Sequence, residues 1–165
     1  MKKHLPADAD RLVWIVTASL VAFGALLLAV AGGIRSMPLV AAVILYSIAG
    51  IVALVLYLGW LARPLRYEVR DDSVTLVRPR PFAAITIPKS AIKEMRHLKL
   101  GQIKPAGLSI GWVFGYAGRF RSGDLGEIMI FGTNPEHAVL IHADEKYVFT
   151  PSNPKRFMHD ISGKK

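Results

Sequence analysis

LVWIVTASLVAFGALLLAVA at residues 12–31 and MPLVAAVILYSIAGIVALVLYLGWLA at residues 37–62 are two long apolar runs without a charged side chain. An α-helix rises about 1.5 Å per residue, so each run is long enough to cross the roughly 30 Å hydrocarbon core of a bilayer. The link between them is short and contains two glycines, which predicts an antiparallel helical hairpin. Uncharged runs of this length would be very unusual in a soluble core. We therefore predict a two-helix transmembrane hairpin over residues 12–62.

Basic residues gather at the two outer ends of this hairpin. They are Lys2, Lys3, Arg11, Arg63, Arg66 and Arg70. The link contains only Arg35. Because segments rich in Lys and Arg stay on the cytoplasmic side, we expect both termini in the cytoplasm and the link outside. Residues 1–11 then form a cytoplasmic tail, and residues 63–165 form a cytoplasmic domain.

The first run has a competing interpretation as a cleaved signal sequence. Ala29-Val30-Ala31 resembles the small-residue site at which such sequences are cut. The apolar run that precedes it is long for the hydrophobic region of a signal sequence, so we expect the helix to be retained. If it were removed, the second run would still anchor the rest of the chain.

Small residues recur at a spacing of four in both runs. The pairs are Ala18 and Ala22, Ala25 and Ala29, and Ala49 and Ala53. Such spacing lets helix backbones approach closely, either within the hairpin or in self-association with a second copy. Neither run contains Asp, Glu, Lys, Arg or His, so we do not expect a proton or ion pathway inside the hairpin.

The composition of the whole chain limits its chemistry. The 165 residues include 21 Lys and Arg against 12 Asp and Glu, a net charge of +9, and no cysteine. The absence of cysteine excludes disulfides, thiolate catalysis and Cys-ligated metals. The five histidines show no recognised ligand spacing, and no nucleophile or acid–base pair stands out. We therefore predict no catalytic residue, metal or cofactor and no enzyme activity, and we do not expect nucleic-acid binding.

From Pro64 onward the pattern changes from continuous apolar runs to alternation. Short alternating segments separated by turn signals predict about seven antiparallel strands, with residues 92–100 ambiguous between strand and helix. Asn153 and Pro154 are a good cap and first-turn residue for a short C-terminal helix that carries Phe157. The predicted fold class is α+β: a helical hairpin, then a curved sheet closed by one helix.

A glycine-rich segment interrupts this alternation. Its glycines are Gly101, Gly107, Gly111, Gly115, Gly118, Gly123 and Gly126. Their spacing matches no phosphate-binding loop. The segment predicts either long twisted strands with bulges or an extended loop packed on a membrane or a partner.

Three motifs in residues 65–161 resemble the membrane-anchored kind of bacterial pleckstrin-homology-like (PH) domain. They are residues 115–120 (GYAGRF), residues 131–135 (FGTNP), and residues 150–154 (TPSNP) followed by Phe157. The family closes with Ser-Pro-x-Asp-Pro-x-x-Phe; Thr150 and Asn153 replace the Ser and Asp here and keep their capping ability. The resemblance implies two packed β-sheets, seven strands in all, with a C-terminal helix, in a bacterial inner membrane.

The resemblance implies less about the ligand. Related eukaryotic domains bind phosphoinositides through basic residues at the first hairpin loop, but residues 71–73 here are Asp-Asp-Ser, so that site is not carried over. Basic residues that could contact anionic lipid or the membrane surface are Arg63, Arg66, Arg70, Arg78, Arg80, Lys89 and Lys93. Each could gain about 1 kcal/mol beside anionic lipid, which would orient the domain rather than select a ligand.

These observations predict a non-catalytic, membrane-anchored interaction module that binds a protein partner at the cytoplasmic face. The expected contact surface is a sheet edge or the glycine-rich segment. Two alternatives remain open at this point: a module that senses anionic lipid, and an accessory subunit of a transporter or membrane enzyme complex.

Overall fold

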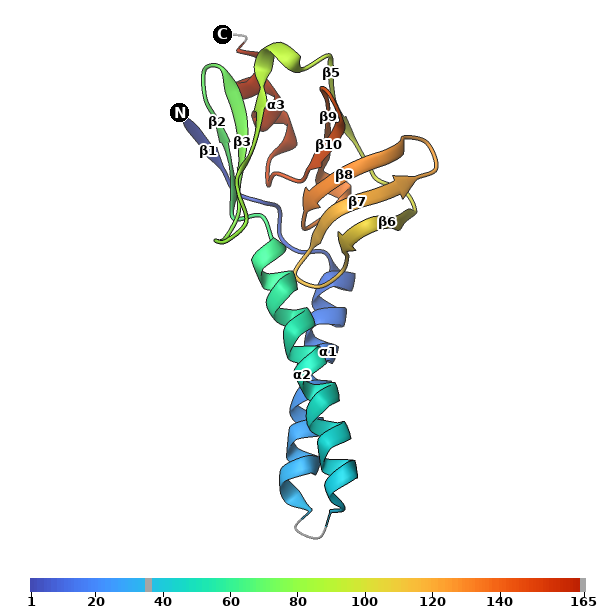
Figure 1. Cartoon of the computed structure of the whole chain (residues 1–165). Coiled ribbons are helices and arrows are strands. Elements are labelled where there is room, and N and C mark those ends of the chain that lie inside the picture. The colour runs from blue at the N-terminus through green and yellow to red at the C-terminus, as the bar shows by residue number, and fades with distance from the viewer. Residues whose placement is uncertain (35–36, 164–165) are drawn as a thin grey trace.

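The computed structural model describes residues 1–34 and 37–163, and its most extended part is a pair of antiparallel helices (Figure 1). These are α1 (Arg11–Gly33) and α2 (Leu39–Ala62). Both are long and apolar enough to cross a membrane, and only 11% of the most apolar window of each is buried. Helices that expose so much apolar surface are compatible with a lipid environment. The link residue Arg35, which helped to orient the predicted hairpin, lies outside the described residues.

The seam between the two helices is narrow. A Cβ atom on Gly24 would lie 3.3 Å from Val52, and Ala49 and Val52 are buried. Of the predicted alanine pairs, only Ala49 is buried in this seam. The remaining members are exposed: Ala18, Ala22, Ala25, Ala29 and Ala53.

A four-stranded antiparallel sheet sits beyond the helix ends. Its order is β1 (Lys2–His4), β2 (Arg66–Val69), β3 (Ser73–Val77) and β4 (Ile85–Pro88). Lys3 pairs with Glu68, so a segment before α1 and a segment after α2 lie side by side. Residues 2–4 fall within the expected tail, and three residues are too few to show an alternating pattern.

The second sheet has six strands in the order β5-β9-β10-β8-β7-β6. Its strands are β5 (Glu94–Leu98), β6 (Ile103–Ile110), β7 (Tyr116–Ser122), β8 (Gly126–Gly132), β9 (Ala138–His142) and β10 (Lys146–Phe149). β8 and β10 pair in parallel, while the other neighbours are antiparallel. Short 3-10 turns are η1 (Lys89–Ala91) and η2 (Pro135–His137), and the last helix is α3 (Pro154–Ser162).

The α+β class, the two sheets and the C-terminal helix confirm the predicted fold. The described residues contain more strands than the seven expected. The glycine-rich segment supplies both β6 and β7, with a register shift between Pro105 and Ser109, and the ambiguous segment supplies β5. The bulged-strand interpretation of the glycines is therefore correct for residues 103–110 and 116–122.

Two apolar clusters hold the domain together, one on each face of the six-stranded sheet. Between the sheets lie the rings of Tyr67, Phe149 and Phe157, each fully buried, with centroids 5.2 Å apart for Tyr67 and Phe149. The other cluster combines sheet residues such as Tyr116 and Phe120 with Val13 of α1. The first turn of α1 is therefore part of the core of the β domain.

Candidate functional site

A loop between β6 and β7, residues 111–115, lies against both helices where they enter the β domain (Figure 1). We call it the junction loop. Its Phe114 N–H donates to Thr17 Oγ1 of α1 at 3.1 Å. On the other helix, a Cβ atom on Gly59 would lie 2.6 Å from Val113 Cγ1. One loop therefore touches both helices, and part of the glycine-rich segment packs on the hairpin.

The backbone of this loop takes an unusual course. Trp112 and Phe114 have φ angles of 67° and 56°, and Gly115 has φ of 138°. Left-handed conformations cost free energy in residues with side chains and persist where surrounding contacts impose them. A Cβ on Gly115 would also lie 2.6 Å from the carbonyl oxygen of Gly132, so this position requires glycine.

The segment that leads into α1 is fastened to the domain by hydrogen bonds. Ala7 N–H donates to Thr150 O at 2.7 Å, and the Asp10 N–H donates to Thr133 O at 3.1 Å. The Asp10 carboxylate caps α1 by accepting from Val13 N–H at 2.7 Å, and it accepts from Tyr116 Oη at 2.9 Å. Burial, together with the neighbouring Asp10 charge, raises the pKa of Tyr116. The hairpin and the β domain are thus joined by directional contacts.

A pocket of about 400 Å³ lies at this junction. Its walls include Val13, Trp14 and Thr17 of α1, Arg63 after α2, and Phe114 of the junction loop. The Arg63 guanidinium lies 5.1 Å from the centroid of the Trp60 ring, and its Nε is buried with no hydrogen-bond partner among the described residues. The pocket therefore combines apolar walls with one cation. We call it the junction pocket.

The fold divides the predicted basic residues between two ends of the domain. Leu65 N–H donates to Val77 O at 2.9 Å, which places the start of β2 level with the end of β3. Four residues consequently lie at the end of the domain near the helices, and we call them the helix-proximal arginines: Arg63, Arg66, Arg78 and Arg80. The others lie toward the far end: Arg70, Lys89 and Lys93. Lys89 N–H, for example, donates to Asp72 O at 2.8 Å in the β2–β3 turn (Figure 1).

Several of these cations already have partners. The Glu68 carboxylate lies 2.7 Å from Arg66 Nε and 3.5 Å from Arg70 Nη2. The hydrogen bond from Arg66 and the charges of both arginines hold the pKa of Glu68 below its usual range. Lys89 Nζ donates to Asp160 O at 3.4 Å. These basic residues therefore do not form one open anion-binding cluster.

Arg78 and Arg80 share a loop, residues 78–84, at the helix-proximal end. Arg78 Nη2 donates to Ala83 O at 2.7 Å, and its guanidinium lies 5.2 Å from the Phe82 ring centroid. Burial lowers the pKa of Arg78 from its ordinary value. Arg80 is exposed and the Phe82 ring is 38% exposed, so this loop presents both a charge and an aromatic edge.

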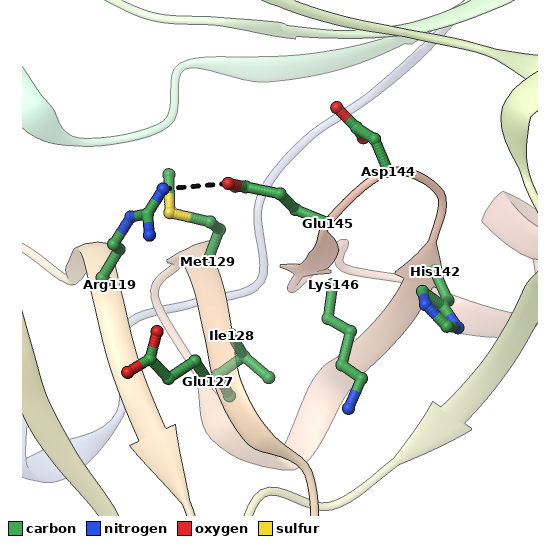
Figure 2. Close-up of a pocket in the computed structure, with 8 residues that line it drawn as sticks. All are labelled: Arg119, Glu127, Ile128, Met129, His142, Asp144, Glu145 and Lys146. Carbon is green, nitrogen blue, oxygen red and sulfur yellow. Dashed lines mark hydrogen bonds and ion pairs between the residues drawn. The ribbon is translucent and has the colours of Figure 1, made fainter.

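A polar groove of about 260 Å³ lies over β7, β8 and the β9–β10 hairpin (Figure 2). Arg119 Nη2 lies 2.9 Å from Glu145 Oε1, while His142 lies apart from this ion pair. The described residues contain no group of three or more His, Asp or Glu side chains that could hold a metal ion. The groove walls carry charges of both signs, which indicates a solvated surface.

Some residues of the junction were not anticipated from the sequence. Gly59 is one of several glycines in the two apolar helices, and nothing in the sequence around Thr17 marks it as a contact residue. A carboxylate at the start of an apolar run is a recognisable N-cap signal, so Asp10 could have been identified as the helix start. The contact of Gly59 with Val113 joins residues far apart in sequence and had no local signal.

The structure shows which contacts the residues of the closing motif make. Asn153 Oδ1 accepts from Arg156 N–H at 3.0 Å and caps α3, as predicted. Thr150 Oγ1 accepts from Thr133 N–H at 2.8 Å, which fastens β10 to the turn after β8. Phe157 is fully buried in the cluster between the two sheets. Thr150, Asn153 and Phe157 thus each have a structural role at the point where α3 closes the domain.

Two sheets closed by a C-terminal helix, preceded by a hairpin of two helices long and apolar enough to cross a membrane, define the class of this protein as an α+β module with a candidate membrane anchor. The chain belongs to the bacterial PH domain family, because the model of that family matches residues 65–165. No curated protein and no solved structure matches the chain. The resemblance inferred from the three motifs is confirmed.

Proposed function

We propose that this protein is a non-catalytic interaction module of a bacterial inner membrane, which binds a protein partner at the cytoplasmic face. In this proposal α1 and α2 span the membrane, and both termini and the PH domain lie in the cytoplasm. PH domains are typically interaction domains, which supports the general assignment. The excess of basic residues on the domain side of the hairpin supports the orientation.

The observation that carries the proposal is the exposed edge of β6. This strand is the last in the described six-stranded sheet and pairs only with β7. An extended partner segment can add to such an edge through main-chain hydrogen bonds. Pro105 lacks an N–H, and the ladder is interrupted between Pro105 and Ser109, so the edge suits a short segment rather than continuous strand stacking.

The surface beside β6 adds a charge preference. A groove of about 410 Å³ there includes Lys104, Arg119 and Arg121 in its walls, with Glu127 as its acidic member. Arg119 pairs with Glu145 and Arg121 pairs with Glu127, so Lys104 is the cation of these walls without an ion-pair partner among the described residues. We therefore expect the partner segment to present an acidic side chain to Lys104. Anchoring in the membrane raises the effective concentration of such a partner, so weak contacts suffice.

The junction gives this surface a fixed position. The contacts of Phe114 with Thr17 and of Val113 with Gly59 hold the domain against the helix ends. The helix-proximal arginines would then face anionic headgroups, each contributing about 1 kcal/mol toward orientation. In this view the junction contacts and the lipid together orient the domain, and β6 selects the partner.

Site-specific photo-crosslinking in intact membranes tests the proposal. A photo-reactive residue at Lys104, on β6, should capture a defined protein, while the same residue at Lys93, beside β5 at the opposite edge of the sheet, should not. Lys104→Glu should reduce recovery of that protein on mild-detergent purification, and Lys93→Glu should leave it unchanged. Equal capture at both positions would contradict the β6 assignment.

The same purification separates the two alternatives. Recovery of a polytopic transporter or enzyme at fixed stoichiometry would make this chain an accessory subunit. Recovery of the chain alone, with anionic lipid enriched around it, would favour lipid sensing and overturn the protein-partner proposal.

A further inference from the structure

The junction pocket lies where a lipid headgroup would meet the protein. It is bounded by the first turns of α1, by residues 63–65 after α2, and by the junction loop. Trp14 is 66% exposed and Leu65 is 37% exposed, so the walls reach the molecular surface beside the helices. A membrane that surrounds α1 and α2 would place its interfacial layer at this level, since aromatic rings such as Trp14 and Trp60 settle there.

The pocket contains one cation whose hydrogen-bonding capacity is not satisfied. Arg63 Nε is buried without a partner among the described residues, and a buried unpaired donor on a charged group is costly. Because Nε is closed to solvent, a ligand in the pocket would bind the terminal guanidinium nitrogens of Arg63. No lining residue is acidic. The nearest carboxylate along α1, that of Asp10, already accepts from Val13 N–H and Tyr116 Oη.

The other polar side chains of the walls have partners as well. Thr17 Oγ1 accepts from Phe114 N–H, and Thr133 Oγ1 donates to Ala7 O. The remaining surface is apolar and includes Val13, Trp14 and Phe114. A complementary ligand would therefore present one anionic acceptor to Arg63 and apolar groups to the other walls.

We infer that the junction pocket binds one anionic phospholipid from the leaflet on the domain side, with its phosphate on Arg63 and its glycerol and upper acyl carbons against Val13, Trp14 and Phe114. A free phosphate would satisfy Arg63 but would leave the apolar walls uncovered. Because this site is separate from β6, it goes beyond the proposed partner-binding function. The bound lipid would act as a third component of the hairpin–domain junction.

Native mass spectrometry of the full-length protein tests this inference. The protein is released from detergent micelles that contain equal amounts of phosphatidylglycerol and phosphatidylethanolamine with the same acyl chains. We expect one retained phosphatidylglycerol per chain and clear preference over phosphatidylethanolamine. Equal retention of the two lipids would overturn the inference, as would displacement by inorganic phosphate at the same concentration, which would indicate a free-anion site. This comparison needs no variant.

Two variants locate the site. Arg63→Gln should weaken retention of phosphatidylglycerol by about tenfold or more, since it removes a charged hydrogen bond. Lys93→Gln, which removes an exposed cation toward the far end of the domain, should leave retention unchanged. Equal retention by Arg63→Gln and the wild type would overturn the assignment of the phosphate to Arg63.

A second substitution tests the apolar part of the junction pocket. It gives an independent result if the Arg63→Gln protein does not fold. Ala9→Phe fills the junction pocket while keeping Arg63, and it should also abolish selective retention. Ala18→Phe, on the exposed surface of α1, is the matched control and should retain the lipid. Folding of each variant is checked by its thermal transition. A folded Ala9→Phe protein that keeps its phosphatidylglycerol would place the lipid elsewhere.

Discussion

Gly59 of α2 lies so close to Val113 of the junction loop that a Cβ atom on the glycine would come within 2.6 Å of Val113 Cγ1. The backbone oxygen of Val113 would be 3.1 Å away, so the loop could not yield by rotating one side chain. This close approach is what allows the β domain to rest directly on the second helix.

Gly59→Ala should therefore destabilise the junction. Inserting one methyl group into a tightly packed contact costs about 1–3 kcal/mol, and we expect the thermal unfolding temperature in detergent to fall accordingly. Gly50→Ala is the matched control on the same helix, since nothing lies within 4 Å of its Cβ position. An equal change in both variants would show that the effect arises from the helix rather than from the junction loop.

Tyr67→Phe should destabilise the core without changing its volume much. Tyr67 is fully buried; its Oη donates to Phe131 O at 2.9 Å and accepts from Thr150 N–H at 3.2 Å. Removing the hydroxyl takes a hydrogen-bond partner from each of these two buried backbone groups, which costs about 1–3 kcal/mol in the free energy of unfolding. Tyr46→Phe, at an exposed position of α2, should leave stability unchanged in the same denaturation series.

The docking of β1 should be sensitive to pH. His4 is buried, with Asp160, Arg156 and Lys2 as the charged groups that act on it, and its Nε2 lies 3.1 Å from Asp160 Oδ2. Burial lowers the pKa of His4 more than Asp160 raises it. The folded state then binds fewer protons than the unfolded state once the pH falls below about 6.5, so stability should fall with pH there.

The variant His4→Phe separates this effect from other titrations. It should flatten the change in stability as the pH falls below about 6.5, measured by chemical denaturation at several pH values. His159→Phe, at an exposed position of α3, should keep the wild-type slope. A second loss at lower pH should persist in both variants, because the hydrogen bond from Lys2 lowers the pKa of Asp160 and its protonation removes that stabilisation.

Reversing charge at the helix-proximal end should weaken the contact of the domain with anionic lipid. In nanodiscs that contain phosphatidylglycerol, the double variant Arg78→Glu and Arg80→Glu should reduce domain–lipid contacts, measured as quenching of a fluorophore on the loop of residues 78–84 by headgroup-labelled lipid. Each neutralised arginine removes about 1 kcal/mol of attraction, and each added carboxylate opposes it. The double variant Lys89→Glu and Lys93→Glu, toward the far end, is the control. Unchanged quenching in the Arg78 and Arg80 variant would show that these residues do not orient the domain on the lipid surface.

The parts of the fold that have local causes could be predicted from the sequence. Charge-free runs predicted α1 and α2, alternation predicted most strands, and the Asn153-Pro154 pair predicted α3. The parallel pairing of β8 with β10 has no local cause, since the register of distant strands depends on how the whole domain packs. β1 was not predicted, because a strand of three residues is too short to show an alternating pattern.

In the candidate site too, contacts with a local cause could be predicted from the sequence, and contacts between distant segments could not. Arg66 and Glu68 alternate on β2 and Arg70 follows its last residue, so the pairing of these three residues could have been predicted from a period of two. The junction pocket could not, because its walls come from segments before α1, after α2 and from the loop ahead of β7. Only the folded chain brings Arg63 and Phe114 to one cavity.

The position of β1 has a consequence for how the chain is made. β1 precedes α1 and its partner β2 follows α2. If α1 and α2 span the bilayer as proposed, the two strands can pair only after both helices have inserted and brought the chain back to the side on which it began. In that arrangement, a chain with one of the two helices left out of the bilayer would have β1 and β2 on opposite sides of the membrane. The edge of β2 and the Asp160 carboxylate would then stay exposed. A protease that recognises exposed strand edges could distinguish such chains from correctly inserted ones.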